Sequence, residues 1–160
     1  MMKPYRIYMD TSVFGGYYDD EFLEPTRCLF QAVFDGKVYA LLSDTLAAEL
    51  IEAPEQVQEL FQKVLNYSCE RLALSIEVEE LRDAYLAESI VTPKYSNDAL
   101  HVAHATIARA DVIVSWNFKY LVNPFRIRRF NSVNMAQGYG AIIIMTPSDI
   151  VNAMEETYEE

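Results

Sequence analysis

The sequence predicts an α/β domain in which helices cover both faces of a parallel sheet of about five strands. Short apolar runs that suit strands buried on both faces alternate with longer stretches of helical periodicity. Four such runs lie at 6–9, 38–42, 112–116 and 141–145, and 72–74 is either a fifth strand or an extended connection. Since strands that alternate with helices form parallel sheets through right-handed crossovers, residues 1–160 are expected to form a single three-layer α/β/α domain.

The helices are predicted from their apolar stripes and from capping residues at their ends. They are expected at 24–35, from residue 45 to Pro54, at 55–66, 76–90 and 98–108, and over a short stretch after Pro147. The segment 98–108 is apolar or small almost all round, so it should be deeply buried, with Ser96 or Asn97 as its cap. The remaining segments are expected to be irregular: a turn at 15–16, a long basic and aromatic connection at 118–134, and a frayed acidic tail at 155–160.

Charge and composition limit the classes of function. A net charge of −11 argues against broad basic binding to nucleic acid, although the cations Lys119, Arg126, Arg128 and Arg129 leave a local site open. The two cysteines have no metal-type spacing, and two reduced buried thiols suit them better than a disulfide. Because no apolar run is long enough for a signal peptide or a membrane span, a cytoplasmic location is expected.

The first strand ends in an acid and two hydroxyls, Asp10, Thr11 and Ser12. Ligands of open α/β sheets bind at the carboxyl ends of the strands. A buried carboxylate there needs hydrogen bonds, an opposite charge or a cation. The alternative interpretation is that Asp10 only caps the turn that follows it.

Three further polar residues occupy comparable places. Asn117 follows a buried strand, Glu49 lies on the helix after the second strand, and Asp98 opens the most buried helix. Carboxylates in apolar surroundings repel one another unless a cation neutralises them, and all-oxygen ligands suit Mg²⁺ or Mn²⁺. Such ions can activate water against a phosphodiester. Each acid also has a simpler interpretation, Asp98 as a helix N-terminal charge and Glu49 as a solvated residue.

These residues give the chain a resemblance to a known family. The ordered set Asp10-Thr11-Ser12, Ser43…Glu49-Leu50, Asp98-Ala99…Ala103…Ala105 and Val114-Ser115-Trp116-Asn117 resembles the PIN domain family, from Arg6 to about Pro147. The resemblance implies a five-stranded parallel sheet with helices on both faces. It also implies a Mg²⁺- or Mn²⁺-dependent ribonuclease, often the VapC-type toxin of a toxin–antitoxin pair.

Carried over residue by residue, the resemblance makes Asp10, Glu49 and Asp98 the three core acids that hold metal, and Asn117 the fourth catalytic position. Many members have Asp in that position, so this chain lacks one negative charge, which puts a second metal site in doubt. We expect the amide oxygen to suffice for orienting a water. Thr11 and Ser12 would orient a ligand or water nearby. Apart from the resemblance, Lys119 and Arg126, with Arg128 and Arg129, either bind substrate phosphates or lie on a solvated loop or pair with the acidic surface of the protein itself.

Other chemistry-bearing residues leave two interpretations open. For His101 and His104, packing or hydrogen bonding is favoured over metal binding, because their spacing of three differs from the spacing of four in helical zinc motifs. The aromatic residues Trp116, Phe118 and Tyr120 either stack RNA bases or belong to the core.

The sequence thus favours a metal-dependent endoribonuclease that acts on RNA, forms a homodimer and pairs with a small antitoxin. The main alternative is a catalytically weakened relative that binds RNA or a protein partner. A third alternative, a Mg²⁺-dependent phosphatase-like enzyme, is disfavoured because Asp10-Thr11-Ser12 does not supply the usual Asp-x-Asp.

Overall fold

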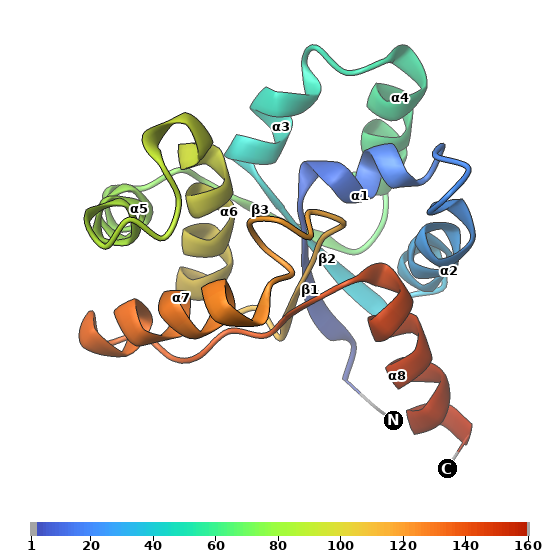
Figure 1. Ribbon diagram of the computed structural model, residues 1–160. Coiled ribbons are helices and arrows are strands. Elements are labelled where there is room, and N and C mark those ends of the chain that lie inside the picture. The colour runs from blue at the N-terminus through green and yellow to red at the C-terminus, as the bar shows by residue number, and fades with distance from the viewer. Residues whose placement is uncertain (1–2, 160) are drawn as a thin grey trace.

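A five-stranded parallel sheet lies at the centre of the protein (Figure 1), whose computed structural model describes residues 3–159. Its spatial order is β3-β2-β1-β4-β5, and every neighbouring pair runs parallel. The strands are β1 (Tyr5–Met9), β2 (Val38–Ser43), β3 (Cys69–Leu72), β4 (Val112–Val114) and β5 (Ile144–Met145). The first strand is therefore central, and the predicted fold class is confirmed.

Helices pack on both faces of this sheet (Figure 1). Residues of α1 (Thr11–Gly16), α2 (Leu23–Phe34), α4 (Glu55–Val64) and α8 (Pro147–Glu159) contribute to the core on one face. Residues of α5 (Ile76–Ala87), α6 (Ser96–Ile107) and α7 (Pro124–Ala136) contribute to the core on the other. The short helix α3 (Asp44–Leu50) follows β2 directly, and a 3₁₀ turn, η1 (Pro93–Tyr95), leads into α6.

The central strand shows why the sheet is buried on both faces. Ile7 and Met9 belong to one core cluster, Tyr8 to the other, and all three are fully buried. The alternation follows from the period of two in a strand. Each core cluster contains an edge-to-face aromatic pair. The ring centroids of Phe14 and Phe30 lie 5.2 Å apart in one cluster, and those of Tyr85 and Phe130 lie 4.9 Å apart in the other.

Two segments that were expected to be irregular are helices. The chain turns directly from β1 into α1, because the Asp10 side chain accepts a hydrogen bond from the Val13 backbone N–H and caps the helix. The expected connection at 118–134 contains α7, which Asn123 caps through the N–H groups of Phe125 and Arg126. The segment was expected to be irregular because few of its residues are apolar and several are basic. Only Phe130, Val133 and Asn134 of α7 are buried, so its sequence lacks a clear apolar stripe.

Other boundaries also differ from the sequence prediction. The third strand is Cys69–Leu72, four residues of an edge strand whose charged side chains gave no apolar signal. The last helix continues to Glu159, so described residues of the expected frayed tail are helical, and residue 160 lies outside the described part. Neither expected cap of α6 is used, since that helix begins at Ser96 with Tyr95 before it.

Two predictions drawn from composition can also be compared with the structure. Both cysteines are free, as expected, but neither is buried: Cys28 is exposed and Cys69 is half-buried, so their predicted burial was wrong. Among residues 3–159, no helix is both long and apolar enough to cross a membrane.

Candidate active site at the carboxyl edge of the sheet

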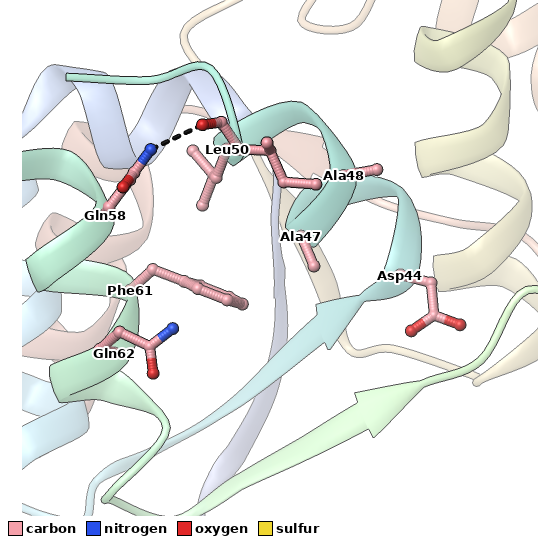
Figure 2. Close-up of a pocket in the computed structure, with 8 residues that line it drawn as sticks. Asp44, Ala47, Ala48, Leu50, Gln58, Phe61 and Gln62 are labelled. Carbon is pink, nitrogen blue, oxygen red and sulfur yellow. Dashed lines mark hydrogen bonds between the residues drawn. The ribbon is translucent and has the colours of Figure 1, made fainter. Parts of the chain in front are cut away.

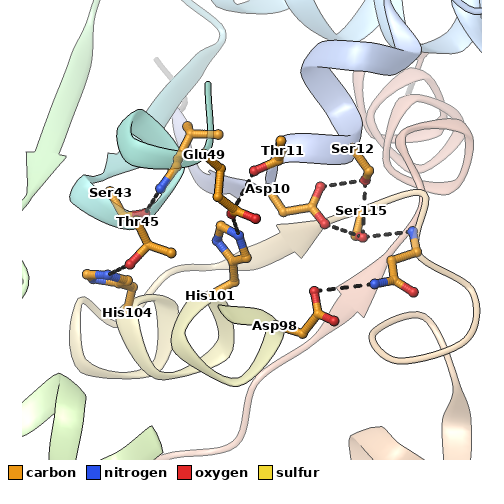
Figure 3. A network of polar contacts seen from close by, with 12 residues as sticks. Asp10, Thr11, Ser12, Ser43, Thr45, Glu49, Asp98, His101, His104 and Ser115 are labelled. Carbon is orange, nitrogen blue, oxygen red and sulfur yellow. Dashed lines mark hydrogen bonds and ion pairs between the residues drawn. The ribbon is translucent and has the colours of Figure 1, made fainter. Parts of the chain in front are cut away.

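The Asp10 carboxylate is held between β1 and α1 by hydroxyl groups (Figure 3). Ser12 Oγ donates to Oδ1 at 2.6 Å, and Ser115 Oγ donates to Oδ2 at 2.6 Å. Only 3% of Asp10 is exposed. Burial raises the pKa of the carboxyl, while the nearby His101 and the two serine hydroxyls act to lower it. Asp10 is therefore both a helix cap and a member of the polar cluster, so the two interpretations of the sequence hold together.

Ser115, at the end of β4, is a site residue that carried no role of its own in the sequence prediction. Its hydroxyl donates to Asp10 and accepts a hydrogen bond from the Asn117 backbone N–H at 2.9 Å. Ser12 similarly accepts from the Trp116 backbone N–H at 2.8 Å. The available signal was a hydroxyl residue at the end of the strand that pairs with β1.

Glu49 reaches the same edge from α3. Its Oε1 accepts hydrogen bonds from Thr11 Oγ1 at 2.8 Å and from His101 Nε2 at 2.5 Å (Figure 3). Burial acts to raise the pKa of Glu49, but the hydrogen bond and charge of His101, with the hydrogen bond from Thr11, lower it overall. Glu49 is thus a half-buried, oriented carboxylate rather than a solvated helix residue.

His101 belongs to a buried chain of hydrogen bonds. The Tyr8 hydroxyl lies 2.6 Å from His101 Nδ1 and 2.7 Å from Ser43 Oγ, while Nε2 faces Glu49. Burial acts to lower the pKa of His101, but Glu49, Asp10 and Asp98 raise it overall.

His104, one turn further along α6, bonds to Thr45 Oγ1 at 2.9 Å through Nε2. No described group satisfies its buried Nδ1, and burial lowers its pKa to about 4. Both histidines of the chain therefore pack and form hydrogen bonds, as favoured from the sequence.

Among the hydrogen bonds of the described residues, Asp98 accepts the fewest of the three acids. In the first turn of α6, it accepts one long hydrogen bond, 3.4 Å from Asn117 Nδ2. Burial raises its pKa to about 6, and the charges of Asp10 and Glu49 add to this effect, against His101 and Asn117. The mutual repulsion means that the three acids, from three separate elements, act on one another in one site.

The donor set fits a hard divalent cation in its chemistry, because it consists of carboxylate and amide oxygens. In the structure, these side chains form hydrogen bonds with other groups. Both carboxylate oxygens of Asp10 accept from serine hydroxyls, and Oε1 of Glu49 accepts from His101. As they stand in the described part of the chain, no three His, Cys, Asp or Glu side chains form a group that could hold a metal ion. The carboxylates of Asp10 and Glu49 repel that of Asp98, and a bound cation would offset this repulsion.

Two of the aromatic residues singled out in the sequence have different surroundings. The Trp116 ring stacks on Phe22 with 4.2 Å between centroids and donates from Nε1 to Thr26 Oγ1 at 2.9 Å, which is a packing role. Phe118 is 53% exposed. The four predicted substrate-binding residues also separate: Thr11 and Ser12 are bonded to the acids, whereas Lys119 and Arg126 lie beside Tyr120.

A groove of about 570 Å³ lies between α3 and α4 (Figure 2). Small and apolar residues of α3 form one wall, and Phe61 of α4 stands in the other. Gln58 Nε2 donates to the Ile51 carbonyl at 2.7 Å and closes one end. The Ile51 side chain is largely exposed. The helix that carries Glu49 therefore also presents an open apolar surface.

Comparison with known proteins supports the fold. No family model and no curated protein matches the chain. Among solved structures, it is similar to a chain in the crystal structure of VapBC2 from Rickettsia felis bound to a DNA fragment from their promoter, with a TM-score of 0.58 and 16% sequence identity. The match covers 88% of this chain and 98% of that chain. The protein therefore has a PIN-like α/β fold, as its sequence resemblance predicted.

Proposed function

We propose that the protein is a Mg²⁺- or Mn²⁺-dependent endoribonuclease. The observation that carries the proposal is the meeting of Asp10, Glu49 and Asp98, from three elements, at the carboxyl edge of the sheet. Burial raises the pKa of Asp98 to about 6 there, and the charges of Asp10 and Glu49 add to the effect of burial. These three acids would hold the metal. A bound divalent ion supplies an activated water and offsets the negative charge that builds up on a phosphodiester during hydrolysis.

The other residues of the site orient the acids. Ser12 and Ser115 hold both oxygens of Asp10, and Thr11 and His101 fix Oε1 of Glu49. The amide of Asn117 donates to Asp98 and accepts from the Tyr120 N–H at 3.0 Å, so it connects the acids to the loop after β4. Because Mg²⁺ needs only one or two carboxylates besides water and phosphate, the three acids suffice without a fourth charge.

RNA cleavage tests this proposal. Wild-type protein in Mn²⁺ should cleave a fluorescent RNA, and Glu49→Gln and Asp98→Asn should each lose about 100-fold or more of the rate. Titration calorimetry should show Mn²⁺ binding that Asp10→Asn and Asp98→Asn abolish. Undiminished Mn²⁺ binding in both variants would remove the metal site from the proposal.

The fold similarity extends the proposal to partners. The comparison structure is a VapBC2 complex with promoter DNA, and we propose that this protein is likewise the toxin of a cytoplasmic toxin–antitoxin pair and a homodimer. The α3–α4 groove is the apolar surface that an antitoxin segment would cover. Light scattering and co-purification with the product of a neighbouring small gene test these two points.

A second candidate function is a catalytically weakened module that binds RNA or a protein. Two observations favour it: Asn117 in place of an acid, and the engagement of Glu49 with His101. Asn117→Asp separates the candidates, because an inactive wild type that gains activity from this substitution needs a fourth charge. An active wild type that loses activity in Asn117→Ala supports the orienting role of the amide.

A further inference from the structure

Next to the acids lies a cluster of cations stacked on two tyrosines, here called the tyrosine platform (Lys94, Tyr95, Lys119, Tyr120 and Arg126). The rings of Tyr95 and Tyr120 stack with 4.2 Å between centroids and 30° between planes. Lys94 Nζ lies 5.5 Å from the centroid of the Tyr95 ring. Lys119 Nζ and Arg126 Cζ lie 5.2 and 4.9 Å from the centroid of the Tyr120 ring.

The platform adjoins the acid site through backbone and side chain. Tyr95 immediately precedes α6, three residues before Asp98. The backbone N–H of Tyr120 donates to Asn117 Oδ1, and the same amide donates to Asp98. The two tyrosines therefore lie beside the acids, where a nucleic-acid strand bound at the acids can reach them.

The charge of the platform is unusual for this protein. The chain carries a net charge of −11, which repels a polyanion. Between residues 3 and 159, none of the described ion pairs involves Lys94, Lys119 or Arg126. Three cations left without acidic partners beside a cluster of acids are suited to hold phosphates at the site.

The tyrosines add a surface for bases. Stacking on aromatic rings is how proteins bind unpaired bases without sequence preference. Lys94 and Lys119 are exposed and flexible, so their amines can move from a ring face to a phosphate when a base arrives. Arg126 is more fixed, because its guanidinium also donates to the carbonyl of Ile90.

We propose that the tyrosine platform binds a single-stranded nucleotide next to the scissile bond, with the base on the Tyr95 side of the stacked pair, which Tyr120 supports from behind, and the phosphate on Lys94, Lys119 and Arg126. The inference takes RNA as substrate from the proposed function and adds which side chains hold the nucleotide beside the scissile bond. A purely structural platform, which only ties η1 to the loop after β4, is the competing explanation.

Binding without cleavage tests the inference. The full chain with Glu49→Gln is titrated in EDTA into a labelled single-stranded RNA of about ten nucleotides and into its duplex, followed by fluorescence anisotropy. In this background, Tyr120→Leu should weaken binding of the single strand about fivefold or more, and Tyr120→Phe should preserve it. Lys119→Gln should lower the slope of log affinity against log salt by about 0.7.

Lys63→Gln is the matched control, because Lys63 Nζ lies 4.3 Å from the centroid of the Phe34 ring, away from the acids. It should leave both affinity and slope unchanged. The melting temperature of each variant is measured in parallel to exclude unfolding as the cause of weaker binding. The Tyr120→Leu variant should bind the single-stranded RNA more weakly even far below its melting temperature. A duplex, which hides its base faces, should not respond to Tyr120→Leu.

The outcomes separate this inference from the proposed function. If the protein cleaves no RNA but binds the single strand tightly and the platform variants weaken this binding, the inference is supported and the proposed nuclease activity is contradicted. Cleavage by wild type with an unchanged KM in Tyr120→Leu and Lys119→Gln keeps the nuclease and overturns the inference. Equal losses for single strand and duplex, or binding of a partner protein instead of RNA at the platform, also overturn it.

Discussion

His101 Nε2 lies 2.5 Å from Oε1 of Glu49, and this contact fixes the direction in which the second acid of the site points. The imidazole is 2% exposed and is itself held by Tyr8 through Nδ1. A positive or hydrogen-bonding group among three carboxylates offsets part of their repulsion. His101, for which the sequence favoured packing or hydrogen bonding over metal binding, therefore also orients Glu49.

Removal of the His101 side chain should destabilise the fold. His101→Leu removes one hydrogen-bond partner each from the buried Tyr8 hydroxyl and from the Glu49 carboxylate, which keep Ser43 and Thr11, and this costs about 2–4 kcal/mol in the free energy of unfolding. Urea denaturation measures the loss. His104→Leu is the control and should cost less than half as much, because it breaks one bond to Thr45 and removes an unsatisfied Nδ1. Equal losses in the two variants would contradict a special role of His101.

The contact should also have a pH window. The pKa of Glu49 is lowered from 4.5, so its contribution to stability is present above pH 4.5 and is lost as the pH falls through the lower folded value. The pKa of His101 is raised from 6.5, so its contribution is present below pH 6.5 and is lost as the pH rises through the higher folded value. The stability difference between wild type and His101→Leu should therefore be largest between pH 4.5 and 6.5, as urea titrations at several pH values would reveal.

Asp98→Asn should stabilise the metal-free protein at neutral pH. The carboxyl has a folded pKa of about 6 against 3.8 in the unfolded chain, so its cost is fully present above pH 6 and vanishes below pH 3.8. After allowance for its partial exposure, the gain is about 1 kcal/mol, or about 2–4 °C in Tm. Calorimetry at pH 7.5 should show the gain, and at pH 3.5 it should disappear. Asp20→Asn, on an exposed loop, should change neither melting temperature.

The adjacent glycines of α1 should respond oppositely to alanine. A Cβ at Gly16 would lie 2.7 Å from Trp116 Cδ1 and Nε1, so Gly16→Ala must displace the indole and should cost about 1–3 kcal/mol. A Cβ at Gly15 meets nothing within 4 Å, so Gly15→Ala should gain about 0.5–1 kcal/mol of helix stability. Thermal melts compare the pair, with tryptophan fluorescence as a second readout. A destabilised Gly15→Ala would contradict the open space beside it.

Much of the fold was predictable because local patterns were strong. The buried runs of β1, β2 and β4 were identified from the sequence and are present in the structure. The errors fall where local signals are weak: a two-turn helix at α1, the polar helix α7 and the charged edge strand β3. Tertiary packing stabilises these elements more than their own propensities do.

The sequence by itself determined that Asp10, Glu49, Asp98 and Asn117 lie near one edge of the sheet, because parallel strands all end on the same side. Only the tertiary structure decided what each acid touches. The Ser115 hydroxyl on Asp10, the imidazole on Glu49 and the stacking of Tyr95 on Tyr120 join residues 25 to 105 positions apart. Such contacts depend on rotamers and on helix placement to within an ångström, which periodicity does not encode.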